Sequence, residues 1–169
     1  AYNAYWMGGF LGFWLAPDMK TFIDGRTEHY TYETYLDYSS VLQMKGARRG
    51  ESHVDVLDRT GVTVFFGVGF PRWWYGVNTT NHLAKVPGWI LVSRSYRHAI
   101  YLRIDSDSAS SPAIDRIVAH YAASGVTFER ETGLDVERII REQVPWAIEN
   151  ALLPLNYPEL VSAASASSH

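Results

Sequence analysis

Cysteine is absent from the 169 residues of this chain. Without thiols there is no disulfide, no cysteine nucleophile and no cysteine-ligated zinc or iron–sulfur centre. Histidines are present but scattered, and none forms a His-Glu-x-x-His pattern or a similar metal-binding spacing. The sequence therefore predicts no metal site and no other cofactor.

An excess of basic residues is also missing. The formal net charge is -3 and the isoelectric point is near 6.1, whereas nucleic-acid-binding domains carry a basic patch or stripe. Lys45, Arg48 and Arg49 form one basic cluster, but Asp37 and Glu51 flank it. We interpret the cluster as a solvated loop and expect no nucleic acid partner.

Long hydrophobic runs are absent as well. The apolar run from Ala1 to Ala16 stops at Pro17, short of the roughly 20 residues that a bilayer-spanning helix needs. It also lacks the charged start of a signal peptide. Because the chain begins inside this aromatic run, we expect it to belong to a longer polypeptide.

Aromatic residues, in contrast, are abundant: 11 Tyr, 7 Phe and 6 Trp make up 14% of the chain. Such side chains bury large areas while keeping a polar edge hydrated. They therefore suit hydrophobic cores, sugar-binding platforms and membrane interfaces, and composition alone leaves the three open.

Apolar runs predict the strands. Residues 62–68 are β-branched and aromatic, which favours a central strand buried on both faces. Residues 89–92 and 99–102 predict a hairpin, and residues 20–23 a short strand. The run 9–15 fits either a buried strand or a short apolar helix.

Capping signals predict the helices. Thr31 begins a helix that runs to about Met44, and Ser52 begins a second one with Asp55 in a capping-box position. Gly61 suits the left-handed position that follows such a helix. Residues 78–86 are compatible with a further short helix.

The organisation expected from these signals is an α/β domain over residues 1–104, followed by a linker at 105–111. Residues 112–161 are expected to form a helical extension with a kink at Pro145, and residues 162–169 a frayed tail. The predicted fold is a small, mostly parallel central sheet with a C-terminal hairpin and flanking helices.

The densest group of ionisable residues is Asp24, Arg26, Glu28 and His29, placed after the predicted strand 20–23. Ligands of open α/β sheets gather at the carboxyl ends of strands. The carboxylates and His29 suit proton transfer, and Arg26 suits binding of a carboxylate or phosphate. An Asp24–Arg26 ion pair that only fixes a tight turn is the structural alternative.

A second candidate site is the run Arg72, Trp73, Trp74 and Tyr75, in a loop after the strongest predicted strand. Exposed indole rings offer flat surfaces for sugars and also suit the membrane–water boundary, and Arg72 can hold an anionic group. The structural alternative is a loop that folds back over one end of the core.

Complete catalytic motifs are missing. No G-x-S-x-G, no P-loop and no nucleophile–base pair is present, and Gly67-x-Gly69 lacks the third glycine of a dinucleotide loop. The sequence therefore favours the interpretation that this chain is one part of a larger protein assembly over the interpretation that it is an enzyme by itself.

The order of several short motifs resembles the extracytoplasmic C-terminal domain of bacterial polytopic glycosyltransferase-like membrane proteins of the dolichyl-phosphate-mannose-dependent type. The resemblance covers residues 2–103, and its most distinctive motif is Phe22-Ile23-Asp24-Gly25-Arg26. The other matching segments are Tyr2-Asn3 with Trp6-Met7-Gly8-Gly9-Phe10-Leu11, Leu57-Asp58-Arg59-Thr60-Gly61-Val62, Pro87-Gly88-Trp89 and Ile100-Tyr101-Leu102-Arg103.

This resemblance implies a non-catalytic accessory domain on the extracytoplasmic face of the membrane. The chemistry would belong to a membrane-embedded portion of the same polypeptide, while this domain binds a glycan acceptor, a lipid-linked sugar or a partner. Two alternatives remain open. One is a small enzyme acting on a sugar or anionic substrate through Asp24, Arg26, Glu28 and His29, and the other is a docking module.

Overall fold

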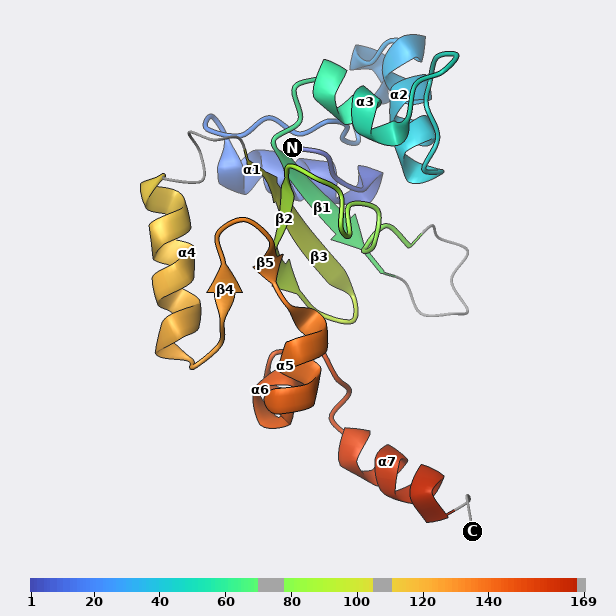
Figure 1. Ribbon diagram of the computed structural model, residues 1–169. Coiled ribbons are helices and arrows are strands. Elements are labelled where there is room, and N and C mark those ends of the chain that lie inside the picture. Colours follow the sequence, from blue (N-terminus) through green and yellow to red (C-terminus); the bar gives the residue numbers. More distant parts are fainter. Residues whose placement is uncertain (70–77, 105–110, 167–169) are drawn as a thin grey trace.

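The computed structural model describes residues 1–69, 78–104 and 111–166, and a five-stranded mixed sheet lies at its centre (Figure 1). Its strands are β1 Val64–Val68, β2 Trp89–Arg94, β3 His98–Arg103, β4 Phe128–Glu129 and β5 Gly133–Leu134. The α-helices are α1 Gly8–Leu15, α2 Tyr32–Leu42, α3 His53–Arg59, α4 Pro112–Ala123, α5 Val136–Glu142, α6 Val144–Glu149 and α7 Tyr157–Ala166, and the 3₁₀ helices are η1 Tyr5–Met7 and η2 Thr27–His29. The predicted α/β class is confirmed.

The strand order is β1-β3-β2-β5-β4, and only the β2–β5 pair is parallel. The prediction of a mostly parallel sheet is therefore wrong. The apolar run at 62–68 gives an edge strand, not a central one. Tyr2 closes its outer edge: the Tyr2 amide donates to the Val64 carbonyl at 2.8 Å, and the Phe66 amide donates to the Tyr2 carbonyl at 2.9 Å. Val64 and Phe66 are only partly buried, so the expected burial on both faces is incomplete, and an apolar run of this kind does not identify a central parallel strand.

The predicted hairpin is confirmed as β2 and β3, which pair antiparallel with a bulge between Leu91 and Ser93. Its turn is held by Ser95, whose hydroxyl oxygen accepts from the amides of Arg97 and His98, each at 3.1 Å. A turn residue with a short polar side chain supplies such bonds locally.

Two hydrophobic clusters lie on the two faces of the sheet. Trp89 belongs to a cluster with residues of α2 and α3, whereas its neighbour Ile90 belongs to a cluster with residues of α4, α5 and α6. Successive side chains of a strand point to opposite faces, so β2 contributes to both. Residues of α2 and α3 thus pack with one set of strand side chains, and residues of α4, α5 and α6 with the other.

The predicted starts of α2 and α3 are confirmed. The Thr31 hydroxyl accepts from the Thr34 amide, and Ser52 and Asp55 form a complete capping box. The two helices are joined by Arg59, which bonds both carboxylate oxygens of the buried Asp37 at 2.8 and 3.0 Å. Gly61 takes the expected left-handed conformation after α3, at φ +67°.

The segment 112–161, expected to be a helical extension, also supplies β4 and β5 to the sheet. Its second predicted helix is divided into α5 and α6, with Pro145 in the first turn of α6, where a missing amide hydrogen is tolerated. Helix α7 extends away from the sheet and includes residues 162–166 of the expected tail (Figure 1). Most of the expected linker, residues 105–110, lies outside the described residues.

The N-terminal predictions need correction. The run 9–15 lies within helix α1, as one of the two readings predicted, but most of its side chains are exposed. Residues 20–23 form no strand, because the Asn3 side chain occupies their backbone groups: its oxygen accepts from the Phe22 amide at 2.9 Å and its amide donates to the Ile23 carbonyl at 2.8 Å. Residues 78–86 form turns and not a helix.

Among the described residues, no helix combines the length and the hydropathy required to cross a bilayer.

Candidate functional site

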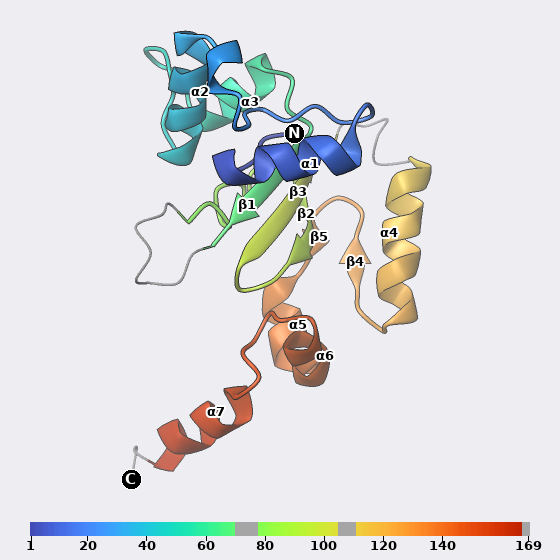
Figure 2. The same ribbon diagram turned by 180° about the vertical axis from the view of Figure 1, so that it is seen from behind.

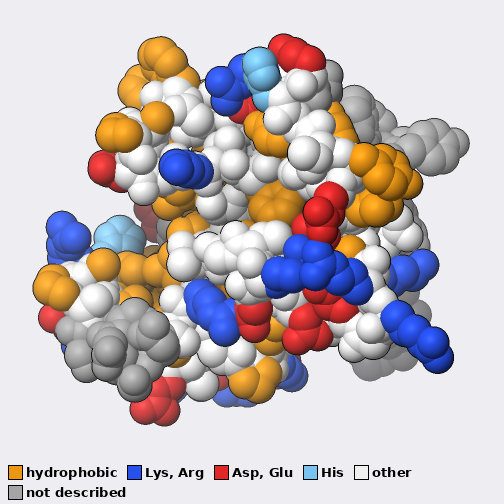
Figure 3. All heavy atoms as spheres, turned by 90° about the horizontal axis from the view of Figure 1, so that it is seen from above, with side chains coloured by type: hydrophobic (Ala, Val, Ile, Leu, Met, Phe, Trp, Pro, Cys, Tyr) orange, Lys and Arg blue, Asp and Glu red, His pale blue; other side chains and the backbone are white. Residues whose placement is uncertain are grey.

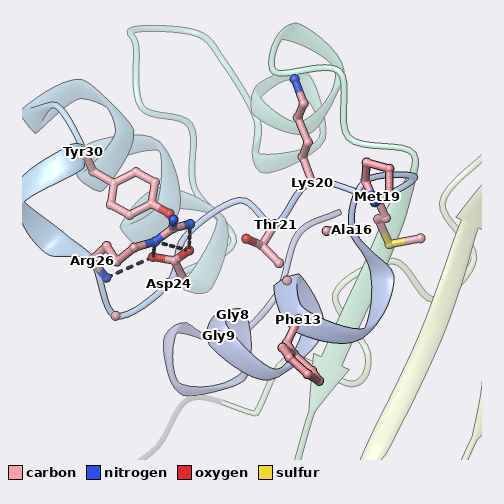
Figure 4. A pocket seen from close by; sticks show the side chains of 13 residues that line it. Gly8, Gly9, Phe13, Ala16, Met19, Lys20, Thr21, Asp24, Arg26 and Tyr30 are labelled. Carbon is pink, nitrogen blue, oxygen red and sulfur yellow. Dashed lines mark hydrogen bonds and ion pairs between the residues drawn. The ribbon is translucent and has the colours of Figure 1, made fainter.

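A groove with a volume of about 760 Å³ lies beside α1 (Figure 4). Three segments close together in sequence form its walls. Their lining residues are Gly8, Gly9, Gly12 and Phe13 of α1, then Ala16, Pro17, Met19, Lys20 and Thr21, and finally Asp24, Gly25, Arg26 and Tyr30. The groove therefore has an apolar floor and basic side chains at its rim.

The glycines of α1 have two different roles. A Cβ atom on Gly8 would overlap the carbonyl oxygen of Ile23 and the Cα atom of Asp24, so Gly8 lets the helix approach that loop. Gly9 and Gly12, in contrast, have nothing within 4 Å of such an atom and no positive φ angle. Neither packing nor backbone conformation requires them to be glycine, and each costs the helix about 1 kcal/mol relative to alanine. Their effect is to keep the floor of the groove free of side chains.

Asp24 and Arg26 meet at one end of the groove (Figure 4). The Arg26 Nη2 atom lies 2.5 Å from Oδ2 of Asp24, and the Arg26 amide donates to Oδ1 at 2.9 Å. The Asp24 side chain is only 4% exposed, whereas that of Arg26 is 70% exposed. The buried carboxylate thus orients the guanidinium while leaving much of it accessible to a ligand.

The ion pair fixes the protonation state of Asp24. The hydrogen bonds from the Arg26 side chain, assisted by Tyr30, lower the pKa of Asp24 to about 2, although burial acts in the opposite direction. A carboxyl group with this pKa stays ionised at neutral pH and cannot serve as a general acid there. Burial and the neighbouring carboxylate raise the pKa of Tyr30, so its hydroxyl keeps its proton.

Glu28 and His29 do not join this arrangement. They lie on η2, their side chains are exposed, and the carboxylate and the imidazole Nε2 are 3.6 Å apart. Neither residue lines the groove. The four ionisable residues predicted as one cluster therefore divide into a paired Asp24–Arg26 at the groove and an exposed Glu28–His29 beside it.

Arg72, Trp73, Trp74 and Tyr75, the second predicted site, lie outside the described residues.

Sequence reasoning missed Tyr30, Phe13 and the two free glycines as parts of a site. The spacing of Gly8, Gly9 and Gly12 is a signal that was present, since three glycines within one apolar helix are costly unless something must approach the backbone. Tyr30 gives no comparable signal, because it is one of 11 tyrosines.

The basic cluster at Lys45, Arg48 and Arg49 lies away from the groove, after α2. Arg48 pairs with Glu33 at 2.5 Å. On the face that carries α2 and α3, basic and acidic side chains adjoin one another (Figure 3). In the described parts of the chain, no three His, Asp or Glu side chains gather closely enough to hold a metal ion.

Comparisons with models of known protein families, with curated proteins and with solved structures found no match to this chain.

Proposed function

We propose that this chain is a non-catalytic accessory domain of a membrane glycosyltransferase-like protein, and that the groove beside α1 binds a glycan acceptor or lipid-linked sugar carrying an anionic group. The observation that carries the proposal is the groove of about 760 Å³ with an accessible Arg26 guanidinium fixed by a buried carboxylate. The volume falls in the range of small-molecule binding sites.

The chemistry of the lining supports a binding role. Arginine presents a planar set of donors that matches carboxylate and phosphate groups, and its pairing with Asp24 reduces the conformational freedom lost on binding. Phe13 offers an aromatic ring at the edge of the groove, and the bare backbone at Gly9 and Gly12 allows a flat ligand to approach closely. An extended, partly apolar ligand with one negative charge fits these features.

The alternative of a stand-alone enzyme has less support. It requires Asp24, Arg26, Glu28 and His29 to converge on one substrate, but Glu28 and His29 do not line the groove. Asp24 is held as an ionised partner of Arg26 and not as a proton donor.

The membrane-embedded partner and the extracytoplasmic location follow from the sequence resemblance and stand as parts of the proposal.

The test of this proposal is a titration of the protein with neutral and anionic oligosaccharides. Binding is monitored by the NMR chemical shifts of the Arg26 guanidinium and of the Gly9 and Gly12 amides. We expect saturable shifts at these groups with the anionic sugars. Arg26→Ala should weaken binding by about tenfold or more, because a hydrogen bond to a charged group contributes about 1.5–3 kcal/mol. Gly12→Ala should weaken it by placing a methyl group in the groove.

Arg48→Ala is the matched control, since Arg48 is also an exposed, carboxylate-paired arginine but lies away from the groove. Equal binding by the Arg26→Ala and wild-type proteins would contradict the proposal. Turnover of a sugar substrate that is lost in Asp24→Ala would show instead that the domain is an enzyme.

A further inference from the structure

The outer side of α1 and η1 carries four exposed aromatic side chains. Trp6, Phe10, Phe13 and Trp14 are 65%, 66%, 77% and 66% exposed, and their spacing places them on one side of a helix. Phe10 and Phe13 contact Trp14, with ring centroids 6.3 and 5.4 Å apart. We call these four residues the aromatic face. Figure 2 shows α1 in front of the upper part of the sheet. The exposure of the four side chains places the aromatic face on the outside of the fold.

The segment that carries the aromatic face, residues 4–17, offers almost no side-chain hydrogen bonds. From Ala4 to Pro17 there is no charged residue, no amide side chain and no serine or threonine. The polar side-chain groups of this segment are the Tyr5 hydroxyl and the indole N–H groups of Trp6 and Trp14. Protein–protein interfaces carry about one hydrogen bond per 100–200 Å² and a polar rim, and this segment cannot supply either.

The size of the aromatic face also argues against a second copy as its partner. Four aromatic side chains that are about two-thirds exposed present on the order of 500 Å². A standard stable interface buries about 800 Å² on each partner. A patch of this size matches the largest apolar patch of a typical monomer, which is often functional, yet it is too small by itself to hold a dimer.

The charges next to the face are balanced. The first four charged residues after the apolar run are Asp18, Lys20, Asp24 and Arg26, and their formal charges sum to zero. The chain as a whole carries -3. The partner that covers the aromatic face therefore does not have to carry a net charge.

From these observations we propose that the aromatic face lies in the headgroup layer of a lipid bilayer, with α1 parallel to the membrane surface. Tryptophan and phenylalanine on one side of a short helix suit this layer, where indole N–H groups reach water while the rings contact acyl chains. Beyond its first turn an α-helix bonds its own backbone donors, so insertion to this depth leaves few of them unpaired. Because the charges are balanced, neutral phosphatidylcholine suffices as the lipid.

Membrane binding would place the groove at the bilayer surface, since Phe13 belongs both to the aromatic face and to the lining of the groove. The proposal does not require the groove to hold a ligand.

The test uses the purified chain and phosphatidylcholine vesicles, with flotation to measure the partition coefficient. The double variant Phe10→Ser/Trp14→Ser should lower partition by about tenfold or more, because interfacial binding scales with buried apolar area. Neither residue lines the groove, so oligosaccharide binding should stay unchanged in this variant. Vesicles with brominated acyl chains should quench tryptophan fluorescence in the wild type, and less in Trp6→Phe/Trp14→Phe.

The matched control is Tyr32→Ser/Leu155→Ser, which removes two side chains that are 78% and 84% exposed elsewhere on the surface. This control should partition like the wild type. Adding an anionic lipid or raising the salt concentration should change partition by less than about threefold, since net attraction to the headgroups is absent.

Three results would overturn the proposal: no flotation of the wild type, equal flotation of the Phe10→Ser/Trp14→Ser variant, or a wild-type dimer that this variant converts to a monomer. The last result would assign the face to a second copy of the chain. Loss of vesicle binding with retained oligosaccharide binding separates this proposal from the function proposed for the groove.

Discussion

At the scale of single residues, Asp24 makes stability depend on pH in the acid range. Its pKa is lowered from the usual 3.8 to about 2 by Arg26, so the unfolded chain takes up a proton at a pH where the folded chain does not. The stabilising contribution is complete above pH 3.8 and is lost as the pH falls toward about 2.

We therefore expect Asp24→Asn to flatten the loss of stability between pH 4 and pH 2, as measured by the urea midpoint at each pH. Glu28→Gln is the control, because this exposed carboxylate lies outside the Asp24–Arg26 pair. A wild-type curve with the same acid slope as that of Asp24→Asn would mean that the ion pair does not form in solution.

The residue scale also shows why part of the site was predictable. Asp24 and Arg26 are two residues apart, on either side of Gly25. Opposite charges at this spacing in a turn can form an ion pair without help from distant parts of the chain. Tyr30 lies next to the same pair because the chain turns back at η2, and no sequence pattern predicts that turn. Glu28 and His29 were grouped with Asp24 by sequence proximity alone, which does not determine the direction of a side chain.

At the scale of elements, α1 should respond in opposite ways to the same substitution at two adjacent glycines. Gly8→Ala should destabilise the protein by about 1–3 kcal/mol, because its methyl group would overlap the backbone of Ile23 and Asp24. Gly9→Ala meets no atom within 4 Å and should stabilise the helix by up to about 1 kcal/mol. Urea unfolding of both variants measures the difference. A loss of stability in Gly9→Ala similar to that in Gly8→Ala would show that α1 packs differently.

Elements with local signals were predicted well, and those that depend on distant partners were not. The capping residues Thr31 and Ser52 determine where α2 and α3 begin, and the hairpin of β2 and β3 is closed by its own turn. The predicted strand at 20–23 failed because Asn3, far away in sequence, bonds its backbone. For residues 9–15 the helix alternative was right and the buried strand was wrong, because an apolar pattern does not show whether the rest of the chain covers a segment.

At the scale of the whole molecule, the parallel pair of β2 and β5 joins the C-terminal segment to the sheet. Gly133 makes this contact possible, since it has φ +80° and a Cβ atom there would overlap the backbone of Leu91. Gly125 also has a positive φ, +69°, but has nothing within 4 Å of a Cβ atom. The two positions therefore differ in the close approach and not in backbone conformation.

We expect Gly125→Ala to cost about 1–2 kcal/mol, the penalty of a left-handed conformation. Gly133→Ala should cost more than this, and it should lower the hydrogen-exchange protection of Tyr121 and Ile139 more than that of Phe65, because the first two lie in the cluster that β5 helps to anchor. Equal costs for the two variants would contradict the close contact at Leu91.

The Asn3 side chain has a consequence that concerns how this protein can vary. The Asn3 side chain bonds the backbone of Phe22 and Ile23. These bonds hold the two ends of residues 4–21 together, so that the segment forms a closed loop on the fold. The free-energy cost of closing such a loop grows only slowly with its length. The loop that carries α1 can therefore change in length and in its exposed side chains as long as Gly8 keeps its contact with Ile23 and Asp24, so one scaffold can be adapted to different surfaces.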